Sequence, residues 1–179
     1  MKYSIFSSNN NKNYLFYAPL TALSWMHVGY KPVLVYIRGK EDKQVSYILE
    51  FLRELQVDVK IIENTTFIPN TNFAQIVRLY AWMLDFDAND YLLTADIDMF
   101  VASRNYFNMQ NMQKDINIFF ANAYNYSRFP ICYLGAQQKV WAEIMCKRSD
   151  NIVNEIAFQL ESNIGKNFNE HEIWNYDEN

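Results

Sequence analysis

The chain has 179 residues, of which 50% are hydrophobic, and this is enough to bury one core in a single globular domain. Its 16 basic and 20 acidic residues leave a net charge of -4, so there is no basic field that would attract a nucleic-acid backbone. We therefore expect a single domain that does not bind nucleic acid.

Short apolar runs typical of strands alternate with segments of helical period, which predicts an α/β domain with a mostly parallel central sheet flanked by helices. The expected strands are residues 3–6, 33–37, 57–62, 91–95, 116–121 and 131–134. The expected helices are residues 14–28, which end near Gly29, then 41–55, 73–84, 137–146 and 152–160. No repeat or Pro/Gly/Ser linker interrupts the pattern, so we expect one domain over residues 1–179.

Residues 14–30 contain no Lys, Arg, Asp or Glu and resemble a membrane span in that respect. Polar residues interrupt the segment, and an apolar run of this length is more typical of a core helix, so no membrane span is expected. The apolar start of the chain is too short for the core of a signal peptide. Cys132 and Cys146 have no metal-type spacing and are too few for a disulfide framework, which favours buried free thiols.

Asp96 and Asp98 follow the apolar strand expected at residues 91–95. On an extended backbone, side chains at positions i and i+2 share a face, so both carboxylates can reach one cation. Oxygen ligands favour hard ions such as Mn²⁺ or Mg²⁺, and two carboxylates leave coordination positions that a diphosphate can fill. A metal held there would neutralise charge on a departing nucleotide diphosphate.

The D-x-D tripeptide alone is a weak signal, because Asp85 and Asp87 form a second copy in the same chain. The two copies differ in position. Asp85 and Asp87 lie in a polar turn after a helix, whereas Asp96 and Asp98 follow a buried strand. Ligands of open α/β sheets gather at the carboxyl ends of strands, which favours the second copy as the functional one.

Arg78 and Leu79 on a helix, followed by residues 90–100 with their apolar strand and D-x-D, resemble the signature of GT-A glycosyltransferases. A first strand, a Ser/Asn loop, a tyrosine and a long helix also resemble the nucleotide-binding start of that family. The resemblance implies a GT-A (Rossmann-like) fold, with residues 1–100 as the nucleotide-sugar-binding half and residues 101–179 as the acceptor half. It also implies transfer of a sugar from a nucleotide-diphosphate donor, expected to be a UDP-sugar, to a hydroxyl of a glycan acceptor, with Mn²⁺ or Mg²⁺ as cofactor.

The resemblance assigns roles to individual residues of the donor half. Asp96 and Asp98 would hold the metal, Asp96 and Ile97 would lie against the nucleotide sugar, and Arg78 would contact the diphosphate or the donor sugar. The residues expected to hold the base and ribose are Ser7, Ser8, Asn9, Asn10 and Tyr14. Two simpler alternatives stay open: Arg78 as a surface helix residue, and residues 7–11 as a solvated turn.

The segment at residues 129–136 lies where the family has an N-A-G-like segment but departs from that pattern, so no role transfers to Cys132 or Gly135. Trp141, on the helix that follows, is expected to lie in the core rather than to form a sugar platform. The acceptor half therefore matches the family less closely than the donor half.

The end of the chain supplies the remaining candidates. Asp177 is the expected general base that removes the proton of the acceptor hydroxyl, with Glu178 as the substitute. His171 is a candidate third metal ligand. The alternatives are a disordered acidic tail and a solvated histidine.

Abundant Asn, Tyr, Phe, Ile and Lys, together with the motif pattern, resemble glycosyltransferase domains of large algal DNA viruses of the chlorovirus kind. This implies a viral protein that is one domain of a longer enzyme and builds a capsid glycan in the host cytoplasm. Two other functions stay open. One is a non-catalytic sugar-nucleotide or glycan-binding module. The other is a phosphatase of the haloacid-dehalogenase kind, which Phe100 and the mid-chain position of the motif oppose.

Overall fold

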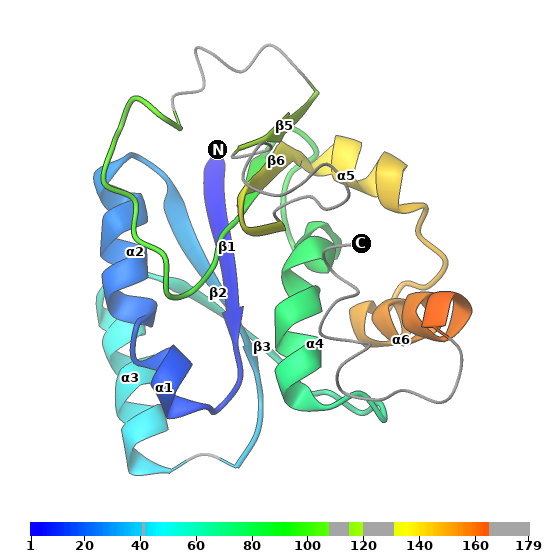
Figure 1. Ribbon diagram of the computed structural model, residues 1–179, viewed down its shortest axis with the longest axis horizontal. Helices are drawn as coiled ribbons and strands as arrows, with labels where there is room; N and C mark the ends of the chain where they lie inside the picture. Colours follow the sequence, from blue (N-terminus) through cyan, green and yellow to red (C-terminus); the bar gives the residue numbers. More distant parts are fainter. Residues whose placement is uncertain (41, 108–114, 120–130, 165–179) are drawn as a thin grey trace.

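The computed structural model describes residues 1–40, 42–107, 115–119 and 131–164 (Figure 1). Its strands are β1 (Lys2–Ser8), β2 (Lys31–Ile37), β3 (Asp58–Ile62), β4 (Tyr91–Thr94), β5 (Ile116–Ile118) and β6 (Leu134–Gln137). Its α-helices are α1 (Lys12–Leu15), α2 (Ala18–His27), α3 (Lys43–Glu54), α4 (Asn70–Val77), α5 (Gln138–Met145) and α6 (Ile152–Ile164). Two 3₁₀ helices are η1 (Arg78–Met83) and η3 (Ile131–Tyr133).

A six-stranded sheet in the order β3-β2-β1-β4-β6-β5 forms the centre of the described chain. The first four strands in this order are parallel, and β6 runs antiparallel to both β4 and β5. In β2, every residue after Lys31 is buried, as expected for a parallel strand that is covered on both faces. The predicted α/β class with a mostly parallel sheet is confirmed.

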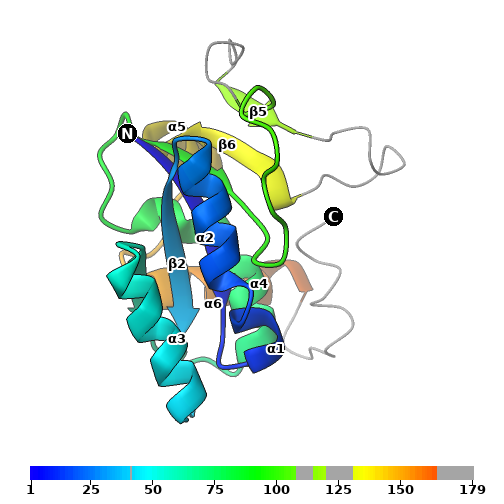
Figure 2. The same cartoon turned by 90° about the vertical axis from the view of Figure 1, so that its left-hand side faces the viewer.

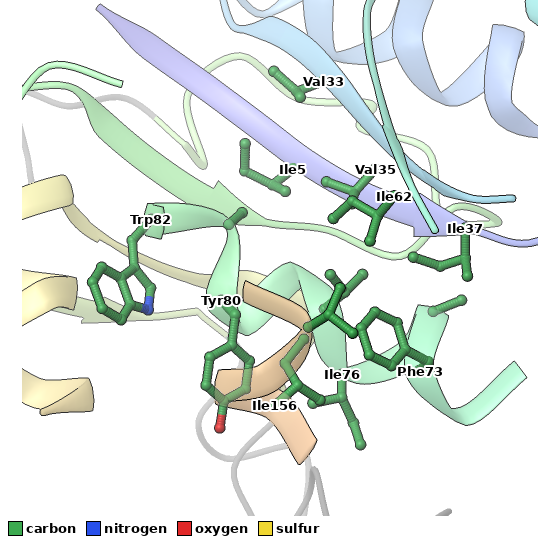
Figure 3. Close-up of a cluster of buried hydrophobic side chains, with 14 of the residues drawn as sticks. Ile5, Val33, Val35, Ile37, Ile62, Phe73, Ile76, Tyr80, Trp82 and Ile156 are labelled. Carbon is green, nitrogen blue, oxygen red and sulfur yellow. The ribbon is translucent and has the colours of Figure 1, made fainter. Parts of the chain in front are cut away.

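Helices cover both faces of the sheet, and each face has its own hydrophobic cluster. On one face α1, α2 and α3 pack around Trp25 and Phe6, and on the other α4, η1, α5 and α6 pack on Ile5 and its neighbours (Figures 1 and 2). Figure 3 shows the second cluster, in which Ile156 of α6 lies among side chains from η1 and α4. Both clusters are almost completely buried, so the sheet is the rigid support of the residues at its edges.

The helix expected at residues 14–28 is instead two helices, α1 and α2. Asn11 caps α1, because its side chain accepts a hydrogen bond from the backbone N–H of Asn13 at 3.1 Å. Pro19 explains the new start, since proline lacks a backbone N–H and fits only the first turn of a helix. No helix of the described residues is long and apolar enough to cross a membrane, as expected.

Glycine ends α2 as the sequence predicted. Gly29 has a φ of +86°, and its N–H donates to the carbonyl of Met26 at 3.0 Å. The N–H of Tyr30 donates to the carbonyl of Trp25 at 3.0 Å, and the two rings lie 5.2 Å apart, which completes a Schellman motif with its apolar contact. Gly29 is therefore needed at this position for its backbone conformation.

Replacing Gln56 with glycine is expected to raise the free energy of unfolding by about 0.5–1 kcal/mol. Helix α3 ends in the same motif as α2, but Gln56 takes the left-handed position with a φ of 62°. Glycine adopts this conformation without the steric cost that glutamine bears. Denaturant unfolding would measure the gain, and Gln56→Ala should give none, because alanine retains the Cβ. An equal gain in both variants would contradict this explanation.

The strand expected at residues 131–134 is wrong. Residues Ile131–Tyr133 form η3, and the strand β6 begins at Leu134, three residues after the expected start. A short apolar run does not reveal its own register, and here the register comes from Gly135, which pairs with Leu93 of β4. A Cβ added at Gly135 would lie 2.7 Å from Cζ of Tyr91, so only glycine fits beneath that ring.

Both cysteines are free, as expected, but they differ in burial. Cys132 is half-buried, whereas Cys146 is exposed at the end of α5, where its φ of 49° is left-handed. The expectation of two buried thiols is therefore wrong for Cys146, which is the C-cap residue after the last turn of α5 and is exposed. Trp141 is in the core, as expected, and its indole N–H donates to the carbonyl of Leu92 at 3.2 Å.

Candidate functional site

The carboxyl ends of β1 and β4 mark the point where the sheet reverses its strand order. From β1 the chain proceeds outward to β2 and β3, and then returns to the other side of β1 with β4. Open α/β sheets bind ligands at such a switch point, outside the carboxyl ends of the strands. Two groups of sequence-predicted residues lie there, because Ser7 and Ser8 end β1 and Asp96 follows β4.

The backbone at the D-x-D differs from the extended strand that was expected. Strand β4 ends at Thr94, and the chain turns at Ile97 and Asp98. A hydrogen bond joins this turn to α2, where the Thr21 hydroxyl donates to the carbonyl of Ile97. Ile97 is buried, whereas Asp96 is partly exposed and Asp98 is exposed. Both carboxylates therefore flank a residue that anchors the turn in the core.

Arg78 is held beside the first of these carboxylates. Its Nη1 forms an ion pair with Oδ1 of Asp96 and donates to the carbonyl of Ala95 at 3.1 Å. The Arg78 side chain is 9% exposed and that of Asp96 is 29% exposed. The alternative that Arg78 is a surface helix residue is therefore wrong, because the side chain is buried against the D-x-D.

The 3₁₀ helix η3 lies on the other side of Asp96. Burial, followed by the negative charge of Asp96, raises the pKa of the Cys132 thiol to about 11, although the positive charge of Arg78 lowers it. Burial also raises the pKa of Tyr133, with contributions from Cys132, Asp96 and Asp98. The raised pKa favours the protonated and weakly nucleophilic form of Cys132 at neutral pH.

Thr94 fixes η3 against β4. Its hydroxyl donates to the carbonyl of Ile131 and accepts a hydrogen bond from the N–H of Leu134 at 2.9 Å. Thr94 is buried, so these bonds are shielded from water. Thr94 lies two residues before Asp96 in the sequence. Its side chain therefore holds Cys132 and Tyr133 next to the D-x-D.

Replacing Thr94 with valine is expected to lower the free energy of unfolding by about 1–3 kcal/mol. Valine keeps the shape of the side chain but leaves the buried N–H of Leu134 and the carbonyl of Ile131 without their partner. Thermal unfolding checks the prediction. Thr65→Val, at an exposed position outside the helices and strands, is the control with little expected effect. Equal stability of Thr94→Val and the parent would show that η3 is held by other contacts.

The residues at the end of β1 are packed against α4 and do not form a solvated turn. Ser8 and Asn9 are buried. The Ser7 hydroxyl donates to the carbonyl of Ala74, and the Asn9 amide donates to the Thr71 hydroxyl at 3.2 Å. The solvated-turn alternative is therefore wrong, and the side chains of Ser7 and Asn9 serve first to join β1 to α4.

Asn10 and Tyr14 are the more accessible members of this group. The Asn10 amide donates to the carbonyl of Lys40 at 2.9 Å, and a Cβ at Gly39 would lie 2.8 Å from its Cγ. Tyr14 is 44% exposed on α1. The structure thus brings together Ser7, Ser8, Asn9 and Asn10 at one strand end, and Arg78, Asp96 and Ile97 at the neighbouring one.

Several expected residues lie apart from the site or outside the described chain. Asp85 and Asp87 are exposed in the turn between η1 and β4, as expected for the second D-x-D copy. Asp177, Glu178 and His171 fall outside the described residues. Among the residues that are described, no three His, Cys, Asp or Glu side chains form a cluster suited to a metal ion.

The whole chain resembles solved glycosyltransferase structures. The galactosyltransferase LgtC in complex with donor and acceptor sugar analogs is 14% identical, with a TM-score of 0.53 over 98% of this chain and 69% of LgtC. The glycosyltransferase GlyE of Streptococcus pneumoniae TIGR4 is 13% identical, with a TM-score of 0.50 over 98% of this chain and 43% of GlyE. No family model and no curated protein matches the sequence. The likeness shows that the chain has a glycosyltransferase fold, as the GT-A resemblance implied.

Proposed function

We propose that this chain transfers a sugar from a nucleotide-diphosphate donor, a UDP-sugar in the first instance, to a hydroxyl of a glycan acceptor. The observation that carries the proposal is the position of Asp96 and Asp98 at the switch point, beside the end of β1 and next to a buried arginine. The fold supports it, because LgtC, which shares the fold, is a galactosyltransferase crystallised with donor and acceptor sugar analogs. We also propose that this chain is one domain of a larger viral enzyme that acts in the host cytoplasm. This part of the proposal rests on the amino-acid composition and the motif pattern.

Asp96 and Asp98 fit a divalent metal such as Mn²⁺ or Mg²⁺. Both are oxygen donors with some exposure, and they flank the buried Ile97. One oxygen of Asp96 is occupied by Arg78, which leaves its second oxygen and the carboxylate of Asp98 for a cation. A metal bound there would neutralise charge on the departing nucleotide diphosphate. The two protein ligands leave coordination positions for phosphate oxygens.

Other residues around this site have proposed roles in donor binding and in proton transfer. Arg78 supplies a fixed positive charge at the base of the D-x-D, which favours an anionic donor nearby. The backbone groups after β1, together with Asn10 and Tyr14, are the proposed contacts of base and ribose. Asp177 is the proposed general base, with Glu178 as its substitute, and both are proposals from the family resemblance alone.

A non-catalytic sugar-nucleotide or glycan-binding module is the second candidate. The observation that favours it is the lack, within the described residues, of a third carboxylate, histidine or thiolate grouped with Asp96 and Asp98. Slow hydrolysis of the UDP-sugar by the isolated chain would favour the transferase, because hydrolysis requires a working metal site. Donor binding without turnover, across several acceptors, would favour the module.

The experiment that tests the proposal is calorimetric titration of UDP and GDP into the protein with Mn²⁺, with EDTA, and again on Asp96→Ala and Asp98→Ala. We expect UDP binding that needs Mn²⁺, falls at least tenfold in either variant and is stronger than GDP binding. Asp85→Ala and Asp87→Ala, in the second D-x-D, are matched controls with unchanged binding. Absence of nucleotide binding under every condition would overturn the donor site.

A further inference from the structure

The outer side of α2 exposes large apolar side chains that belong to neither hydrophobic cluster. Leu20 and Leu23 lie about one turn apart on α2 and are 52% and 45% exposed, and Phe16, in the turn between α1 and α2, is 64% exposed. The ring of Tyr17 lies 5.7 Å from that of Phe16 and 6.2 Å from that of Phe100, which continues the surface to the segment after Asp98. We call Phe16, Tyr17, Leu20, Leu23 and Phe100 the apolar α2 face.

No other helix or strand of the described chain lies in front of α2 when the molecule is viewed from this side (Figure 2). The segment that follows Asp98 runs beside the helix instead, with the N–H of Val101 bonded to the Ser24 hydroxyl at 3.1 Å. Of the seventeen exposed large hydrophobic residues in the described part of the chain, seven lie in residues 14–23 and 99–100. Such a concentration marks an interaction surface, because single exposed apolar residues are ordinary and a contiguous set is not.

The charges around the apolar α2 face indicate its partner. Residues 13–30 contain no Lys, Arg, Asp or Glu, and the only charged residue in 99–107 is Arg104, beside His27 at 3.4 Å. Lys2 lies 5.1 Å from the ring of Tyr30, just past the end of α2. The carboxylate at the border is Asp98, within the candidate site. The apolar α2 face of a protein of net charge -4 is therefore bordered by two basic side chains, Arg104 and Lys2, and one acidic side chain, Asp98.

We propose that the apolar α2 face docks the protein on an anionic lipid surface. Phenylalanine, tyrosine and leucine side chains enter the headgroup boundary, and basic side chains beside them are attracted to anionic lipids. A second copy of the chain fits less well, because a two-fold contact would bring Arg104 and Lys2 of both copies together, with Asp98 as the carboxylate at the border. Docking in this way would hold the switch-point site close to the lipid surface.

The test is flotation of the full chain with vesicles of phosphatidylcholine, and with vesicles in which about one-third of the lipid is phosphatidylglycerol. We expect binding that is stronger to the anionic vesicles and weaker in high salt. The double variant Phe16→Ser with Leu20→Ser should bind roughly tenfold more weakly, since two exposed apolar side chains are lost. Arg104→Gln should reduce the preference for anionic vesicles.

The matched control is Tyr47→Ser with Ile144→Ser, two side chains that are 69% and 47% exposed on α3 and α5. This control should float like the parent, and UDP titration on both double variants separates docking from loss of the donor site. Failure of the parent to float, or equal loss in both double variants, would overturn the proposal. The proposal would also be overturned if the parent did not bind vesicles but formed a concentration-dependent dimer in sedimentation, and if Phe16→Ser with Leu20→Ser removed that dimer. The inference needs neither metal nor donor and is independent of the proposed transfer reaction.

Discussion

Replacing Arg78 with leucine in the metal-free protein is expected to lower the free energy of unfolding by about 2–3 kcal/mol. The arginine is almost completely buried, and its loss leaves the Asp96 carboxylate without a cation and the Ala95 carbonyl without a donor. The figure is at the lower end for a buried pair, because Asp96 keeps some exposure to water. Urea unfolding with EDTA present measures it, and Arg53→Leu on the surface of α3 is the control.

A double-mutant cycle separates the ion pair from general packing. Asp96→Asn alone should also destabilise the protein, because Arg78 is then buried without a counter-charge. The double variant should be more stable than the sum of the two losses predicts, by roughly 2 kcal/mol. If the two losses simply add, Arg78 stabilises the fold through packing and the pairing of its charge with Asp96 contributes nothing measurable.

Replacing Glu155 with alanine is expected to lower the free energy of unfolding by about 3 kcal/mol at neutral pH. Glu155 is fully buried near the start of α6 and accepts from the N–H groups of Arg148 at 2.9 Å and Ser149 at 2.7 Å. The amide of Gln159 donates to its other oxygen at 3.0 Å. Alanine removes all three bonds and loosens the connection between α5 and α6. Chemical unfolding measures the loss, and Glu143→Ala, at an exposed position, is the control.

The contribution of Glu155 should depend on pH. Burial would raise its pKa, but the hydrogen bonds from Gln159, Arg148 and Ser149 outweigh this and lower the pKa below its ordinary value of 4.5. The folded state thus favours the carboxylate, and the stabilisation is present above pH 4.5 and is lost as the pH falls through the lower folded value. The stability gap between parent and Glu155→Ala should therefore narrow in acid. A gap that widens as the pH falls would contradict this assignment.

The fold was predictable where a pattern is local. The run in β2 is apolar at almost every position, and the stripe of α3 has a clear helical period, so both were located within two residues of their ends. The position of Asp96 after a buried strand was also readable, because it depends only on the order of elements. Pro19 indicates the start of a helix at α2, but the continuous apolar run around it led to the prediction of one longer helix.

Contacts between distant residues could not be predicted from the sequence. Nothing in the spacing of Arg78 and Asp96 shows that they pair, since their meeting depends on how η1 lies against β4. Cys132 and Tyr133 were missed for the same reason, because the Thr94 hydroxyl brings η3 to the site. The one signal in the sequence was Thr94 itself, a polar residue in an otherwise apolar strand.

Because β1 is both the first strand of the chain and a central strand of the sheet, we expect its two edges to be completed at different stages of folding. On one edge Tyr3 pairs with Lys31, and Val33 in turn pairs with Asp58, across short crossovers. On the other edge Lys2 pairs with the distant Tyr91, and closing that longer loop costs more conformational entropy. We therefore expect the site to join a half that folds early to one that folds late, and amide hydrogens should exchange faster in β4 and β6 than in β2.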